Sequence, residues 1–286
     1  MKMSARTWSS WFAALSVIAC GVCVSAETTA RRIVTLAPNL TELTFTAGAG
    51  DRIVGAVDYS DFPEAARAIP RVGDAFRVDF ERVLALHPDL VLVWDGGTAT
   101  TVVQRLQALQ LNVRTITTFR LADVGNAVRE IGKLAGTSAT AEAAALKFDH
   151  DIAAVRAEYA GHALLSVFLQ VNDKPLYTVN GKQIMSELVD LCGGRNVFAT
   201  LDKFAPEIGI EAVIAANPQV IVATDANGAD AAAQWQRWSN MGAVKHGNVF
   251  NVPPDDITRA TTRLARGARV LCRTLETARD RLRGSH

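Results

Sequence analysis

The sequence lacks the short motifs that identify several large classes of enzyme. It contains no Gly-x-Ser-x-Gly elbow, no His-Glu-x-x-His pair and no Gly-x-x-x-x-Gly-Lys phosphate loop. Four scattered histidines lack partners at metal-ligand spacing, and we interpret them as surface residues: His87, His150, His162 and His246. We therefore expect a protein that is not an enzyme and has no resident metal or cofactor.

An excess of charge of one sign is also absent. Thirty basic and 29 acidic side chains give a net charge of +1, and the two signs are mixed along the chain. A nucleic-acid surface needs a basic patch or stripe, so we expect no nucleic-acid partner. Nothing in this balance calls for self-association, and we expect a monomer.

Long apolar runs are missing after the first 26 residues, and none reaches the ~18 residues that a membrane span needs. In the first 26, Lys2 and Arg6 precede an apolar run that ends in small residues at Val24-Ser25-Ala26. This pattern is typical of a signal peptide over residues 1–26 and predicts export to the periplasm. The alternative is a lipoprotein box over residues 17–20, with a lipid anchor at Cys20.

Cysteine is scarce. If Cys20 and Cys23 leave with the signal, Cys192 and Cys272 remain. An exported chain with one pair of cysteines favours a disulfide, with two separate buried thiols as the alternative. A metal site is disfavoured, because neither cysteine has a Cys-x-x-Cys partner or a nearby histidine.

What the sequence does contain is one segment that occurs twice, 130 residues apart. The copies are Phe80–Val93, FERVLALHPDLVLV, and Ile210–Ala223, IEAVIAANPQVIVA. Each predicts a short helix that opens with a glutamate, Glu81 or Glu211, stops at a proline and leads into a buried strand. The period is too long for a solenoid, so it indicates two similar lobes with one ligand between them.

Strands and helices alternate on both sides of a helical middle. Strands are expected at 33–36, 53–57, 113–116, 164–171 and 249–252, and a last helix at 262–281. Such β-α-β alternation predicts parallel sheets with helices on both faces. Thr41-Glu42-Leu43 and Ser186-Glu187-Leu188 begin corresponding helices that end at glycines, which extends the repeat beyond its first segment.

Residues 121–159 form two helices divided at Gly136-Thr137-Ser138, with Thr137 or Ser138 as the cap of the longer one. A helix of about 20 residues spans ~30 Å and would join two lobes rigidly. We predict two Rossmann-like α/β lobes with mainly parallel sheets, at 27–136 and 161–286, joined by a single long α-helix at 137–160. The alternative is a surface helix of one domain.

Aromatic residues fall in or near the loops that follow predicted strands. In open parallel sheets ligands bind outside the carboxyl ends of the strands, where flat side chains suit a large ring system. The candidates are Tyr59, Phe62, Phe76 and Trp94 in the first lobe and Phe168, Tyr177, Phe204 and Trp235 in the second. For Phe168 and Trp235 a place in the core is the more natural interpretation.

Charged residues supply two further candidate sites. Asp255 and Arg259, four residues apart, either pair with each other or face a cleft and bind amide groups of a ligand. Glu81 and Glu211 each gain from the helix dipole, but that does not explain their equivalent places in two lobes. We interpret them as docking residues that engage arginines of a partner with matching symmetry.

The chain resembles the cobalamin-binding periplasmic proteins of ABC importers, within the helical-backbone class of substrate-binding proteins. The likeness runs from about residue 31 to 279. Its motifs are Ala37-Pro38-Asn39 with Thr41-Glu42-Leu43, Tyr59-Ser60-Asp61-Phe62-Pro63, Glu81-Arg82 before Leu86-His87-Pro88-Asp89-Leu90, Trp94-Asp95-Gly96-Gly97, Leu191-Cys192-Gly193-Gly194 with Asn196 and Phe198, and Asp255 to Arg259.

The resemblance implies roles for particular residues. It implies two α/β lobes joined by one long helix, with a corrinoid, as transported ligand, held between aromatic walls. Tyr59, Trp94 and Tyr177 would line the ligand, and Phe76 and Phe204 would stand where relatives have tryptophan. Asp255 and Arg259 would meet the corrin amides, Glu81 and Glu211 would dock on permease arginines, and Cys192 and Cys272 would form the family disulfide.

Other functions stay open. A haem or ferric-siderophore binding protein of the same fold is the main alternative; haem would need an axial ligand such as Tyr59 or a histidine, and anionic siderophores would need several arginines in the cleft. An exported hydrolase or chelatase is the enzyme alternative, which a turnover assay and a metal analysis would test.

Overall fold

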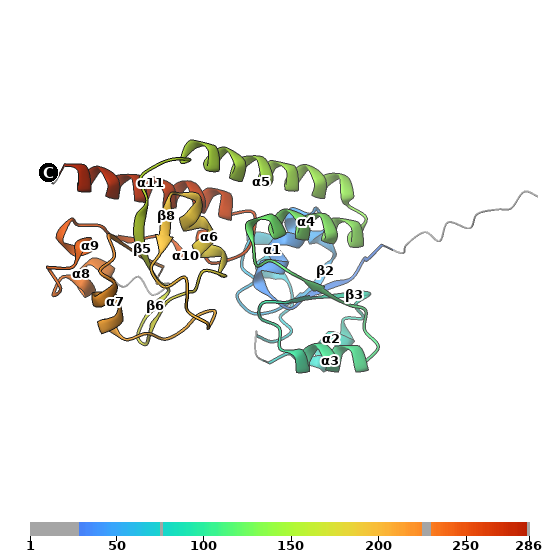
Figure 1. The fold of residues 1–286 in the computed structure, drawn as a ribbon. Coiled ribbons are helices and arrows are strands. Elements are labelled where there is room, and N and C mark those ends of the chain that lie inside the picture. Colours follow the sequence, from blue (N-terminus) through green and yellow to red (C-terminus); the bar gives the residue numbers. More distant parts are fainter. Residues whose placement is uncertain (1–28, 75–76, 225–229, 285–286) are drawn as a thin grey trace, which may run out of the picture.

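Two four-stranded parallel sheets, one in each lobe, form the frame of the molecule (Figure 1). The computed structural model describes residues 29–74, 77–224 and 230–284. The N-terminal sheet contains β1 (Ile33–Thr35), β2 (Ile53–Ala56), β3 (Leu90–Trp94) and β4 (Val113–Ile116). The C-terminal sheet contains β5 (Leu165–Gln170), β8 (Gly194–Asn196), β9 (Val220–Ala223) and β10 (Val249–Asn251). The predicted fold class is confirmed.

The two sheets have the same strand order. It is β2-β1-β3-β4 in the first lobe and, read from the other edge, β8-β5-β9-β10 in the second. In each lobe the first strand along the chain pairs with the second and third, and the third pairs with the fourth. The sequence repeat supplies the third strand of each sheet, β3 and β9, so it corresponds to a repeat of topology.

Helices cover the sheets on both sides. The first lobe contains α1 (Pro38–Thr46), η1 (Gly50–Arg52), η2 (Glu64–Ala68), α2 (Phe80–Ala85), α3 (Thr100–Ala108) and α4 (Leu121–Ala135), and α5 (Ser138–Glu158) follows. The second contains α6 (Ile184–Leu191), α7 (Ile210–Ala216), α8 (Ala231–Trp235), α9 (Gly242–Lys245), α10 (Pro254–Ile257) and α11 (Leu264–Arg283). A short antiparallel hairpin of β6 (Asn172–Asp173) and β7 (Leu176–Tyr177) stands beside the two parallel sheets, in agreement with the prediction of mainly parallel sheets.

The repeated helices α2 and α7 end before their prolines, through a left-handed residue. His87, with φ of 44°, precedes Pro88, and Asn217, with φ of 42°, precedes Pro218. The α conformation is disfavoured before proline, so the helix stops one residue or more ahead of it. The prediction of helix, stop and buried strand is confirmed, and all four residues of β9 are buried.

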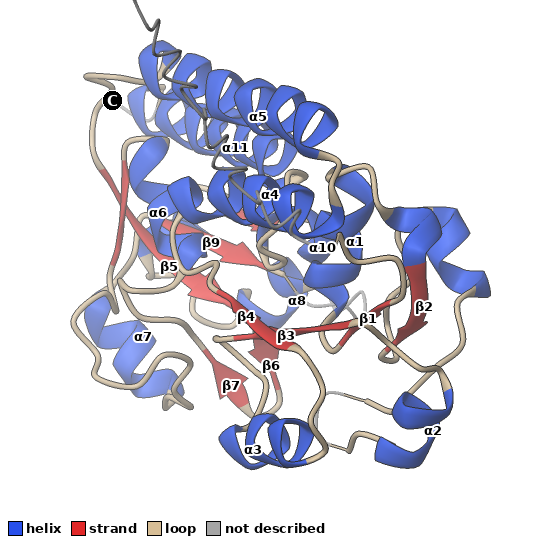
Figure 2. Ribbon diagram, turned by 90° about the vertical axis from the view of Figure 1, so that its right-hand side faces the viewer, coloured by secondary structure: helices blue, strands red, loops and turns tan. Residues whose placement is uncertain are grey.

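The long helix α5 does not stand alone, because the second long helix, α11, packs against it (Figure 2). Arg269 of α11 lies 3.3 Å from Asp151 of α5, which ties the C-terminal helix to the linker. Thr137 takes the N-cap position of α5 as predicted, but its hydroxyl caps no backbone N–H and has no hydrogen-bond partner. Gly136, with φ of 69°, ends α4 in the left-handed conformation that glycine adopts at little cost.

One hydrophobic core runs through both lobes. It combines side chains of the first lobe, such as Leu43, with Phe148 and Ile152 of α5 and Leu188 of the second lobe. Two further clusters, around Val91 and around Phe168, each belong to a single lobe. Because well-packed cores resist deformation, this shared layer limits rotation of one lobe against the other.

Phe168 and Trp235 are core residues. Both are fully buried, and their rings meet edge-to-face with centroids 5.9 Å apart. The indole N–H of Trp235 donates to Oε1 of Gln170 at 2.8 Å, as buried tryptophans usually require. The interpretation of both aromatics as core is confirmed.

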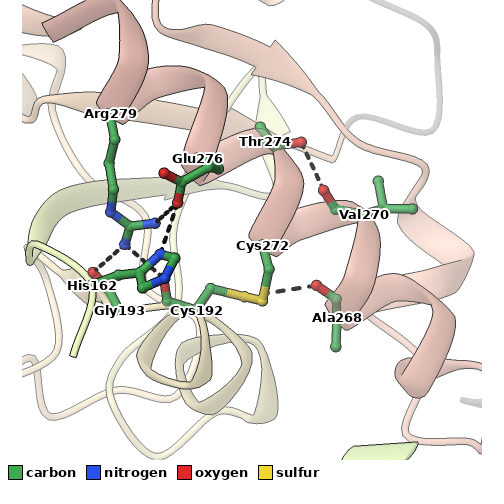
Figure 3. The surroundings of a disulfide bond; sticks show 9 residues. All are labelled: His162, Cys192, Gly193, Ala268, Val270, Cys272, Thr274, Glu276 and Arg279. Carbon is green, nitrogen blue, oxygen red and sulfur yellow. Dashed lines mark hydrogen bonds and ion pairs between the residues drawn. A yellow bond between two sulfur atoms is a disulfide. The ribbon is translucent and has the colours of Figure 1, made fainter. Parts of the chain in front are cut away.

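The structure joins Cys192 to Cys272 in a disulfide between the end of α6 and the middle of α11 (Figure 3). Nearby, the guanidinium of Arg279, buried in the same layer, donates to the carbonyl oxygens of Ala163, Cys192 and Gly193. The predicted pairing is confirmed, and it fastens the C-terminal helix to the second lobe.

We expect the Cys192→Ser, Cys272→Ser double variant to lower the free energy of unfolding by about 2–4 kcal/mol, because the bond closes a loop of 80 residues in the unfolded chain. Urea unfolding of the oxidised wild type and the variant measures the difference. Reduction of the wild type should reproduce it, and a change below ~1 kcal/mol would contradict a stabilising role.

Candidate functional site

The carboxyl ends of both sheets lead to contacts between the lobes. We call this part the interlobe region: residues 58–62, 94–98 and 117–120 of the first lobe, and 176–177, 197–207 and 253–263 of the second. Three kinds of contact cross it: aromatic, cation–π and ionic. This is the place where open parallel sheets bind ligands.

A buried carboxylate of the first lobe anchors the ionic contact. Glu42 on α1 is 3% exposed and accepts two hydrogen bonds from Arg263, from Nη2 at 2.6 Å and from Nε at 2.9 Å. Nη1 of Arg259 donates to the same carboxylate at 3.2 Å. Bidentate arginine–carboxylate pairs are among the strongest hydrogen-bonded pairs, so Glu42 connects α1 firmly to the turn before α11.

Arg259 also reaches a loop of the first lobe. Its Nη1 donates to Oδ1 of Asp61 at 2.8 Å, while its Nε lies 3.4 Å from Asp255. Burial opposes ionisation of Asp61, but the hydrogen bond and charge of Arg259 outweigh it and hold the pKa of that carboxyl below its usual value. The pKa of Arg259 is raised, because bonds to Asp61 and Glu42 outweigh its burial.

Asp255 and Arg259 therefore pair with each other, which is the first of the two arrangements considered from the sequence. Arg259 also bonds Asp61 and Glu42 of the opposite lobe. Asp255 is half exposed, which leaves carboxylate oxygen available beside the interlobe region. Their contact with ligand amides stays a prediction.

A second ion pair joins the lobes with the roles exchanged: the second lobe supplies the glutamate and the first lobe supplies the arginine. Glu187, at the place on α6 that Glu42 takes on α1, accepts from Nε of Arg120 at 3.1 Å and Nη2 at 3.3 Å. It also accepts from the backbone N–H of Leu121 at the start of α4. Each lobe thus uses the glutamate of its first helix to hold the other lobe, although Glu187 is 19% exposed and its pair is more open to water.

Trp94 is held by its own turn. The indole N–H donates to Oγ1 of Thr118 at 2.8 Å, and the ring lies against the backbone of Gly96 and Gly97. A Cβ at either glycine would stand 2.5–2.6 Å from a ring carbon, so both positions need glycine for close approach. The Gly-Gly pair thus serves to position a half-buried tryptophan at the end of β3.

The other aromatic candidates differ in exposure. Tyr59, in the left-handed conformation with φ of 63°, is 77% exposed, and Tyr177 of β7 is half-buried. Phe204 of the second lobe meets Phe119 of the first edge-to-face, with ring centroids 6.1 Å apart. The structure thus shows a contact between the lobes for Phe204, whereas contact of Tyr59 and Tyr177 with a ligand stays a prediction and Phe76 lies outside the described residues.

Glu81 and Glu211 stand elsewhere. Both are exposed in the first turns of α2 and α7, on opposite lobes and on the side of the molecule away from α5 (Figure 1). Within the described residues neither carboxylate forms a salt bridge. Their role in docking stays a prediction.

The sequence reasoning missed most of the interlobe contacts. It assigned no role to Glu42, Asp61, Arg263 or Phe119. One signal was present, because the corresponding glutamates of Thr41-Glu42-Leu43 and Ser186-Glu187-Leu188 stood in matching helices. A buried carboxylate needs a partner, so that match could have directed a search for arginines.

No group of three or more His, Cys, Asp or Glu side chains among the described residues is placed to hold a metal ion. No helix in the described ranges is long and apolar enough to cross a membrane.

The chain is similar to known proteins in both sequence and structure. Residues 33–255 match the periplasmic binding protein family. A vitamin B12-binding protein of Vibrio parahaemolyticus is 30% identical over 249 residues, 87% of this chain and 90% of that protein. The structure of the periplasmic vitamin B12 binding protein BtuF of Vibrio cholerae is similar with a TM-score of 0.82 at 30% identity, over 87% of this chain and 98% of that one.

The same fold also occurs in binding proteins for another macrocycle. The periplasmic haem-binding protein BhuT, solved with two haems, has a TM-score of 0.78 at 22% identity, over 87% of this chain and 99% of that one. At that identity the likeness shows the fold alone.

Proposed function

This chain belongs to the periplasmic binding protein family, and we propose that it captures cobalamin or a related corrinoid between its lobes and delivers it to an ABC importer. The observation that supports cobalamin as the ligand is the similarity to vitamin B12-binding proteins at 30% identity over 87% of the chain. Similarity to haem-binding proteins is weaker in sequence and extends only to the fold. The protein is a carrier and not an enzyme.

The side chains of the interlobe region suit a large, flat ligand. Tyr59, Trp94, Tyr177 and Phe204 offer aromatic surface at the carboxyl ends of the two sheets, and Phe76 joins them in the proposal. Burial of a macrocycle between such walls supplies most of the affinity, and a few polar groups fix its orientation. Asp255 and Arg259 supply an acceptor and donors for the amide side chains of a corrin.

The shared core and the two glutamate links support a carrier that closes little on its ligand. Walls that are largely in place before binding lose little conformational entropy when the ligand enters. Recognition by the importer then depends on surface residues that do not move much. Glu81 and Glu211 are suited to this role, as paired carboxylates that engage arginines on the membrane permease subunits.

Export precedes this function. Residues 1–26 would act as the signal peptide, or Cys20 would carry a lipid that tethers the carrier to the membrane; both lie outside the described residues. In either case the mature protein works in the periplasm, where its disulfide is stable.

We expect purified mature protein to bind cyanocobalamin one-to-one with a Kd below ~1 µM and haem at least tenfold more weakly. Aromatic walls suit an amide-rich corrin, and the interlobe arginines Arg120, Arg259 and Arg263 are already paired with carboxylates of the protein. Tryptophan fluorescence quenching and the visible spectrum follow both titrations. Tighter binding of haem than of cobalamin would overturn the assignment of cobalamin as the ligand and leave the carrier function in place. Trp94→Ala should weaken cobalamin binding, with Trp238→Ala, a half-buried residue of the second lobe's core, as its control.

A further inference from the structure

Each of the two repeated helices exposes an aliphatic side chain one turn after its glutamate. Leu84 follows Glu81 on α2 and is 38% exposed. Ile214 follows Glu211 on α7 and is 39% exposed. Residues three apart lie on the same face of a helix, so each carboxylate has an apolar neighbour beside it.

The repeat holds both helices against their lobes in the same way. Val83 and Val213 are fully buried, while Phe80 and Ile210 are partly buried against the single-lobe cores. These inward positions leave the glutamate and the aliphatic residue facing out from each lobe. Both pairs are therefore presented on short helices with a fixed orientation.

Exposed aliphatic residues are otherwise rare in the described chain. Of its seven exposed large hydrophobic residues, three are aromatic and belong to the interlobe region: Tyr59, Phe62 and Phe204. Leu146 on α5 and Leu164 before β5 remain besides Leu84 and Ile214. Two of four thus occupy the same step of the sequence repeat, which a random scatter of surface residues does not explain.

We propose that Leu84 and Ile214 are the apolar halves of two equivalent docking contacts, each formed with the neighbouring glutamate. The partner is a two-fold symmetric pair of membrane permease subunits, and each subunit offers a cation beside an apolar depression. This proposal rests on the proposed function, since it names the surface by which the carrier meets its importer.

Charge and symmetry select this partner. Glu81 and Glu211, which form no salt bridge within the described residues, lie on similar lobes and are complementary to two cations related by a two-fold axis. Arg82, the residue after Glu81 on α2, donates to the carbonyl of Arg71 and is turned to its own lobe. Carboxylates guide the approach and set the register, while burial of apolar side chains at the centre of a contact slows dissociation.

The test measures cobalamin uptake by spheroplasts of the source bacterium that lack this protein, with purified carrier added back. We expect Leu84→Ser with Ile214→Ser to raise the carrier concentration for half-maximal uptake at least tenfold, and each single variant to give a similar, smaller shift. The cobalamin Kd and Tm should stay at wild-type values, because both side chains are partly exposed. Leu146→Ser with Leu164→Ser is the matched control and should leave uptake unchanged.

The exchange variant Leu84→Ile with Ile214→Leu keeps an aliphatic side chain at both places and should support normal uptake. Normal uptake by the double serine variant, when Glu81→Ala with Glu211→Ala abolishes uptake, would overturn this inference and leave the proposed function intact. Failure of the wild type to bind cobalamin or to support uptake would overturn the proposed function and this inference with it.

Discussion

Replacement of Glu42 by alanine is expected to lower the free energy of unfolding by about 3–5 kcal/mol. Glu42 is 3% exposed and accepts three hydrogen bonds from Arg259 and Arg263, whose side chains are themselves mostly buried. Without this carboxylate, two mostly buried guanidinium groups lose a hydrogen-bonded partner of opposite charge, and that loss is costly. Asp61 and Asp255 offset part of the loss, which favours the lower end of the range and a Tm decrease of roughly 6–12 °C.

Glu187→Ala is the matched control, because Glu187 occupies the corresponding place on α6 and also holds the opposite lobe. Its partner Arg120 is 65% exposed, so water replaces the lost carboxylate and the expected cost is about 1 kcal/mol. Thermal and urea unfolding of both variants measure the difference. Equal losses, or a loss below ~1 kcal/mol for Glu42→Ala, would show that burial of Glu42 does not govern the link between the lobes.

Simultaneous replacement of Glu81 and Glu211 by alanine is expected to abolish delivery of ligand while leaving the cobalamin Kd near its wild-type value. Removal of one partner of a desolvated charge pair costs about 2–5 kcal/mol at an interface. Two such losses lower the affinity of the carrier for its importer at least ~1,000-fold. Both residues are exposed on helices away from the interlobe region, so ligand binding has no reason to change.

The uptake assay with spheroplasts measures delivery, and a fluorescence titration measures affinity. Glu130→Ala with Glu158→Ala makes the same change in net charge at exposed sites on α4 and α5 and should leave uptake intact. Loss of uptake in this control would assign the effect to overall charge. A weaker cobalamin affinity in the Glu81, Glu211 variant would contradict a role confined to docking.

The two experiments separate residues that stabilise the fold from residues that bind a partner. Glu42 acts between the lobes and affects the stability of the fold, whereas Glu81 and Glu211 act on its outer surface and affect a partner. Phe119 and Phe204 form a ring contact across the lobes, and Phe204 is one of the proposed ligand-binding residues. Stability, binding and delivery are therefore expected to respond to different substitutions.

The sequence by itself determined the two-lobe α/β fold. Hydrophobic period and the positions of proline and glycine are local signals, and they placed the strands within one or two residues, as at β1 and β5. The repeat indicates two lobes without reference to any contact, and both the single remaining pair of cysteines and the family resemblance favour a disulfide between Cys192 and Cys272. Tyr59, Trp94, Tyr177 and Phe204 are candidates for ligand binding because they follow or lie near strands, at the ligand side of an open parallel sheet, and their contact with a ligand stays a prediction.

Only the tertiary structure decided which charges meet. Glu42 and Arg263 are 221 residues apart, and Arg120 and Glu187 are 67 apart, so no local pattern connects them. Their meeting depends on how the lobes are set against each other, and that is decided by the packing of α5 with α4 and α11 in the shared core. Pairing of side chains so far apart in the sequence follows from the sum of many weak contacts across the whole molecule. Local sequence patterns carry no information about that sum.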